Sequence, residues 1–269
     1  PQTPNPKPQT PRSKDLLWEI ENQITSRRLS EDIKMEYPVV KSAALEALGT
    51  FCMALLAFPT SPFSPAGPKA DSEILSVALS VVMVVGAFSW ISQRLSGAFF
   101  NPFLCISAFI FGQLSIVNCL ANLAAEFAGA FAAVGALRLF GETQSPINVA
   151  KVSMIQALIF ETVFGLAIGL VFFCTSIHKT APKGVFGFAV PAAQAACLLV
   201  APDLFFSGAN PAITLSFGIL SSGFGSGGIG TLAGHLIGTV IAGLIWKVTC
   251  AQESERYASL PIIEEEIKF

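Results

Sequence analysis

The sequence predicts an all-α membrane protein with six transmembrane helices and two half-helices, arranged as an inverted repeat. Of the 269 residues, 52% are hydrophobic and 13% are charged, whereas a typical soluble domain has roughly 25% charged residues. Apolar runs of the ~20 residues that a spanning helix needs recur along the chain. Two shorter apolar runs each begin with Asn-Pro. The lipid bilayer is therefore the first partner that we expect.

The six predicted spans are separated by segments rich in Pro and Gly, which mark loops. They cover residues 40–58, 74–92, 117–140, 153–175, 185–202 and 229–249. The two short runs, 101–111 and 210–220, are too short to cross a hydrocarbon core of about 30 Å.

Two polar tails flank the spans. Residues 1–36 are rich in Pro and are predicted to be a largely disordered tail, and residues 251–269 form a C-terminal tail. Six crossings place both tails on one side. If that side is the cytosol, only Lys69, Arg138 and Lys151 of the 16 basic residues lie outside, as the positive-inside rule favours. We expect an integral multi-pass protein with both termini cytosolic, in the plasma membrane or an internal membrane.

Spans one to three (about 40–140) and four to six (about 153–249) share one layout. Span one contains the lone Glu46 and span four the lone Glu161, and each is followed by a Ser-Gly-Ala that leads to Asn-Pro. A carboxylate within a membrane is costly, so it should face the bundle interior and find a hydrogen-bond partner. Because each half crosses three times, the second is inverted, and inverted repeats place their shared site near the midplane.

The short runs fit this site as two half-helices that enter from opposite faces and meet at the centre. Asn is a good N-cap and Pro a good first helical residue, so Asn101-Pro102 and Asn210-Pro211 should start these helices with the Asn side chains turned into a lumen. Each helix start contributes about half a positive charge. Such a centre admits neutral, hydrogen-bonding solutes and repels cations and protons. Residues 37–250 are thus predicted to be a channel domain.

These residues resemble the aquaporin, or major intrinsic protein, family. The resemblance runs from Lys41 to Cys250 and includes both Asn-Pro half-helices, the two Glu residues, "SGAxxNP" in the first half and "GHLIGTVIAGLIW" in the sixth span. It implies an aquaporin-like right-handed bundle, homotetramers in which every subunit has its own pore, and a proton barrier at the two Asn residues. We expect no enzyme activity, no cofactor and no nucleic-acid partner.

Departures from the family pattern concern selectivity. The first motif ends in Phe103, where the family usually has Ala, whereas the second motif ends in the regular Ala212. Phe103 should either push the half-helix ends apart or rotate away and alter the lumen. The pattern resembles the unorthodox branches, which are the superaquaporins and the small intrinsic proteins.

A second departure lies at the selectivity filter, where most family members have an Arg three residues after the second Asn. Here that residue is Ile213. Counting onto the other filter positions gives Val81, Leu198 and Ser207. This filter has no fixed charge and few hydrogen-bond donors, so glycerol, urea, peroxide or ammonia are candidate solutes besides water.

Other polar and small residues receive structural interpretations. Glu126, in span three, is expected to bond to a half-helix backbone, and His178 and His235 look solitary. The six Cys residues are interpreted as buried free thiols, among which Cys197, beside Leu198, is a possible mercurial site. Small residues spaced for helix packing are Gly129, Ala133, Gly234, Gly238 and Ala242.

Two other functions stay open at this point. Inverted repeats also build ion- or proton-coupled transporters, which here would use Glu46, Glu161 and Glu126. A non-conducting structural tetramer, with its pore closed by Phe103, is the other alternative. The sequence contains no nucleophile with a base and no metal-ligand set that would indicate an enzyme.

Overall fold

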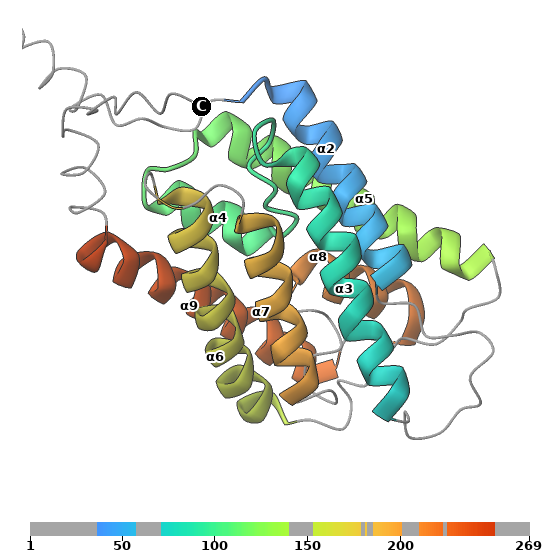
Figure 1. Cartoon of the computed structure of the whole chain (residues 1–269). Helices are drawn as coiled ribbons and strands as arrows, with labels where there is room; N and C mark the ends of the chain where they lie inside the picture. Colours follow the sequence, from blue (N-terminus) through green and yellow to red (C-terminus); the bar gives the residue numbers. More distant parts are fainter. Residues whose placement is uncertain are drawn as a thin grey trace, which may run out of the picture. The chain divides into compact units, whose positions relative to one another are not determined.

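The computed structural model describes residues 37–57, 71–139, 153–178, 181, 185–200, 210–222 and 225–250. Within these residues every regular element is a helix (Figure 1). The predicted tails, residues 1–36 and 251–269, lie outside them.

Among the described residues, five helical segments are long and apolar enough to cross a membrane. They are α2 (Val39–Cys52) with its π-helical extension η1 (Met53–Ala57), α3 (Asp71–Ser92), α5 (Ile116–Leu139), α6 (Met154–Phe172) with η3 (Phe173–Ile177), and α9 (Gly225–Thr249). The predicted fifth span contains α7 (Phe186–Val200), which has 15 residues and is followed directly by residues outside the described ranges.

The sixth span begins earlier than the sequence predicts, at Gly225 rather than residue 229. The Gly-rich run before residue 229 is typical of a loop. In the structure Gly225 starts the helix with a φ of 54°, and Gly227 and Gly228 are buried within its first turn. Close packing against α6 begins just after this run, because a Cβ atom added at Gly230 would overlap the Met154 carbonyl oxygen.

Two short helices start at the Asn-Pro pairs. They are α4 (Pro102–Ile110) and α8 (Pro211–Phe217), which continues into η4 (Gly218–Ser222). The Asn101 side chain accepts from the Phe103 N–H at 3.1 Å, and the Asn210 side chain accepts from the N–H groups of Ala212 and Ile213 at 3.0 and 3.4 Å. Asn caps with Pro as first residue, as expected, explain why the helices begin at these points.

The helices pack in equivalent pairs. Helix α2 packs against α5, α6 packs against α9, and α3 packs against α7 (Figure 1). Each of the two short helices contacts both α5 and α9, and α4 and α8 also contact each other. The third and sixth spans therefore support the two helix starts from either side.

Two close contacts show that the halves have the same register. A Cβ atom added at Gly129 in α5 would overlap the Ala47 carbonyl oxygen, and one at Gly238 in α9 would overlap the Thr162 carbonyl oxygen. Ala47 and Thr162 each directly follow the lone glutamate of their span. Gly129 and Gly238 are thus equivalent positions of the inverted repeat.

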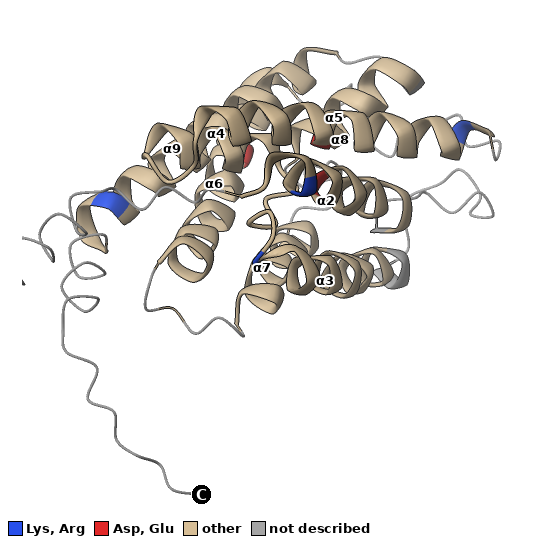
Figure 2. Cartoon of the chain, turned by 90° about the horizontal axis from the view of Figure 1, so that it is seen from above, with Lys and Arg blue, Asp and Glu red and all other residues tan. Residues whose placement is uncertain are grey.

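Charge is scarce along the helices (Figure 2). Three carboxylates, those of Glu46, Glu126 and Glu161, are completely buried among the described residues. Large apolar side chains face outward, for example Met83 and Trp90 on α3, which are 70% and 63% exposed. Apolar side chains outside and carboxylates confined to the interior are what a lipid-facing bundle requires.

Candidate functional site

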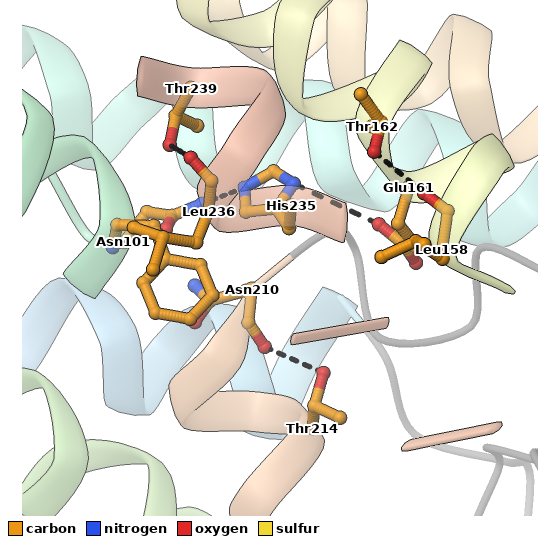
Figure 3. A network of polar contacts seen from close by, with 10 residues as sticks. Asn101, Leu158, Glu161, Thr162, Asn210, Thr214, His235, Leu236 and Thr239 are labelled. Carbon is orange, nitrogen blue, oxygen red and sulfur yellow. Dashed lines mark hydrogen bonds and ion pairs between the residues drawn. The ribbon is translucent and has the colours of Figure 1, made fainter. Parts of the chain in front are cut away.

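The side chains of Asn101 and Asn210 form the centre of the candidate site (Figure 3). Each is buried, at 1% exposure. Because both side-chain oxygens cap their helices, the amide nitrogens are left to donate elsewhere. The Asn210 Nδ2 donates to the Phe100 carbonyl oxygen at 2.5 Å, and the Asn101 Nδ2 lies 3.2 Å from the His235 Nε2. Each amide is thus held in one orientation, because both its oxygen and its nitrogen contact protein groups.

Glu46 organises the segment that leads to Asn101. Its carboxylate accepts from the Ser96 hydroxyl at 2.5 Å and from the N–H groups of Phe99 and Phe100 at 3.1 and 2.6 Å. Phe100 has a φ of 46°, in the left-handed region that a bulky residue rarely adopts. The carboxylate thus stabilises an unfavourable backbone conformation immediately before the helix start.

Glu126, on α5, supports the same helix start from the other side. The Cys105 thiol donates to its Oε1 at 3.3 Å, and the Asn101 backbone also hydrogen-bonds to this carboxylate. Glu126 therefore contacts the first turn of α4, which is the kind of contact that the sequence interpretation expects.

His235 corrects the sequence interpretation, which treated it as solitary. The ring is buried, with its Nε2 against Asn101 and its Nδ1 3.8 Å from the Glu161 Oε2 (Figure 3). Asn101 precedes it by 134 residues, so no local pattern links the two. One signal was available, because His235 stands three residues before Gly238 as Glu126 stands three before Gly129.

Phe103 lies beside this histidine. Its ring centroid is 5.9 Å from that of His235, with 31° between the ring planes, and the side chain is only half-buried. Since α4 and α8 remain in contact, the larger side chain does not separate the two helix starts.

Three of the four residues predicted to line a filter can be located. Val81, Leu198 and Ile213 are buried and belong to one hydrophobic cluster, with exposures of 1%, 2% and 0%. Ser207 lies outside the described residues. Cys197 is buried beside Leu198, but the expectation of buried thiols fails for Cys174, which is exposed, and for Cys52 and Cys250, which are half-buried.

Comparisons with known proteins agree with this geometry. The family model for the major intrinsic proteins matches residues 34–246. The chain is 28% identical over 195 residues to aquaporin TIP1-1 of Zea mays, covering 70% of this chain and 74% of that protein. It is 23% identical over 188 residues to human aquaporin-5, covering 66% and 70%.

The fold is similar to the X-ray structure of the aquaglyceroporin from Plasmodium falciparum. The TM-score is 0.57 at 18% identity, over 81% of this chain and 99% of that one. With paired Asn-capped half-helices, apolar spans and these relatives, the chain is an integral membrane protein that belongs to the major intrinsic protein family.

Proposed function

We propose that the protein is a passive channel for water and small uncharged solutes that excludes protons at Asn101 and Asn210. The observation that carries the proposal is the meeting of α4 and α8, two Asn-capped half-helices from opposite halves of the repeat. The relatives' names, two aquaporins and one aquaglyceroporin, point to the same class of solute.

The proton barrier follows from charge and hydrogen bonding. Each helix start brings about half a positive charge to a region of low dielectric constant, where the repulsion of a cation is weakly screened. The cap bonds to both side-chain oxygens orient the amides as donors. A solute with a lone pair can accept from such donors, whereas a hydronium ion is repelled.

We further propose that Val81, Leu198, Ser207 and Ile213 form the selectivity filter. An apolar side chain at Ile213 supplies no donor and no charge. Because this filter holds no fixed charge, the candidate solutes besides water are small and uncharged, namely glycerol, urea, peroxide and ammonia.

For the assembly, we propose a homotetramer with a pore in each subunit and both termini in the cytosol. The distribution of basic residues supports the orientation. The outward-facing apolar side chains of α3 and the other spans are compatible with contact to lipid or to a second copy.

Stopped-flow light scattering on proteoliposomes tests the proposed solute class. We expect permeability to water, and to at least one of glycerol, urea or peroxide, above that of liposomes without protein. Permeability at the level of empty liposomes for every solute would contradict the proposal, provided that the reconstituted protein is folded.

Replacing Ile213 by Arg tests the filter. We expect glycerol permeability to fall by about tenfold, as an added barrier of ~1.4 kcal/mol would give, while water permeability falls less. The long guanidinium narrows the passage and restores a charge. Ile213→Val is the matched control and should retain glycerol flux. Equal losses for water and glycerol in the folded Arg variant would contradict the filter assignment.

A further inference from the structure

The inverted repeat pairs His235 with Glu126. Because Gly129 and Gly238 make equivalent contacts with the first and fourth spans, the residues three positions before them are also equivalent. The first half therefore carries the buried pair Glu46 and Glu126, and the second carries Glu161 and His235. The second half thus has a histidine at the position where the first half has a carboxylate.

A difference between the two loops accompanies this replacement. The first half reads "SGAFFNP" and the second "SGANP", so the second lacks counterparts of Phe99 and Phe100. These are the residues whose N–H groups bond to Glu46. Neither oxygen of Glu161 has a hydrogen bond in the described part of the chain, and the His235 Nδ1 faces it at 3.8 Å.

Hydrogen-bond chemistry assigns the protons of the imidazole. The Asn101 Oδ1 accepts from the Phe103 N–H, so the group that faces His235 is the amide nitrogen, which can only donate. The His235 Nε2 must then be an unprotonated acceptor. A neutral imidazole with Nε2 unprotonated carries its proton on Nδ1, which faces the Glu161 carboxylate.

The surrounding atoms hold the ring in this position. Gly165, one turn after Glu161, leaves the room for it, since an added Cβ atom there would lie 3.0 Å from the His235 Nδ1 and 2.7 Å from its carbonyl oxygen. The Phe103 ring covers the histidine from α4. The Asn101 contact and both packing neighbours thus define one orientation, in which Nδ1 lies on the side of Glu161.

We propose that His235 is a positioning residue for the pore centre. It is a neutral, Nδ1-protonated imidazole that accepts from the Asn101 amide and directs its own proton to Glu161. In this way the first pore asparagine is held by a side chain of the second half, whereas Asn210 is held by the Phe100 backbone carbonyl. The consequence for transport depends on the proposed channel function, but the hydrogen-bond arrangement does not.

Nitrogen-15 NMR of the reconstituted protein tests the arrangement directly. The chain has two histidines, so labelled histidine in a His178→Asn variant reports on His235 alone. We expect one protonated nitrogen at Nδ1 and one unprotonated, hydrogen-bonded nitrogen at Nε2 at neutral pH. A proton on Nε2, or on both nitrogens, would overturn the proposal even if no solute flux were detected.

Substitutions test the positioning role through the ratio of proton to water permeability. In His235→Gln the amide oxygen can replace Nε2 as acceptor, whereas in His235→Leu no acceptor remains. We expect this ratio to be roughly two- to tenfold higher in the Leu variant than in the wild type, because about one hydrogen bond is lost. In the Gln variant the ratio should be close to the wild-type value.

Thr239→Val is the matched control for these variants. It removes a buried hydroxyl one turn later on α9, which among the described residues bonds within its own helix, to the Leu236 carbonyl oxygen at 3.0 Å (Figure 3). The control should retain the wild-type ratio. Equal ratios in the folded Leu and Gln variants would overturn the positioning role, and if the Leu variant does not fold, a raised ratio in the Gln variant would do so.

Discussion

Replacing Glu46 by Leu is expected to destabilise the folded protein by ~2–6 kcal/mol, because two buried backbone donors lose their acceptor at about 1–3 kcal/mol each. The Ser96 hydroxyl, which also bonds to Glu46, keeps the Ser92 carbonyl oxygen at 3.3 Å as an acceptor. The two donors are the N–H groups of Phe99 and Phe100. They lie in the segment that places Asn101, so channel activity should be lost together with stability.

Two control variants separate this effect from the loss of a buried charge. Glu46→Gln keeps one side-chain oxygen as acceptor and should retain most of the stability. Glu161→Leu alters the equivalent position of the second half, where the described residues show no such set of bonds, and should cost less. Thermal unfolding in one detergent measures all three. A Glu46→Leu variant as stable as wild type would refute this role for Glu46.

Replacing Gly129 by Ala is expected to cost about 3 kcal/mol or more, toward the upper end of overpacking effects. The added methyl group would overlap the Ala47 carbonyl oxygen, and backbone atoms of a packed helix cannot move aside as a flexible side chain does. Helices α2 and α5 would have to separate, which disturbs the contacts of both with the start of α4.

Gly135→Ala, on the same helix, is the matched control. An added Cβ atom there meets nothing within 4 Å, so this change should be neutral or stabilise the helix by up to ~1 kcal/mol. Unfolding temperatures of the two variants provide the comparison. If both variants unfold at the same temperature, the result would contradict the claim that α2 and α5 are too close at Gly129 to accept a methyl group.

The features that the sequence predicted well depend on local signals. Apolar runs of spanning length, Asn-Pro pairs and the recurrence of a lone glutamate are visible along the chain. The Asn-Pro pairs, for example, predict helix starts at Pro102 and Pro211, because Asn is a good N-cap and Pro a good first helical residue.

The features that the sequence did not reveal depend on contacts between distant segments. The partners of Glu46 include two backbone N–H groups, which no side-chain pattern can indicate. His235 seemed solitary because Asn101 and Glu161 belong to other spans. The start of α9 was misplaced because a run of glycines is typical of a loop as well as of close helix packing.

The most direct test of the proposed channel measures solute and proton permeability in the same proteoliposomes. A light-scattering signal follows the solute, and an enclosed pH-sensitive dye follows protons, with and without an imposed pH gradient. We predict solute permeability above that of empty liposomes and independent of the gradient, with proton permeability equal to that of empty liposomes. Solute flux that requires the gradient, or a proton leak that accompanies water flux, would contradict a passive channel with a barrier at Asn101 and Asn210.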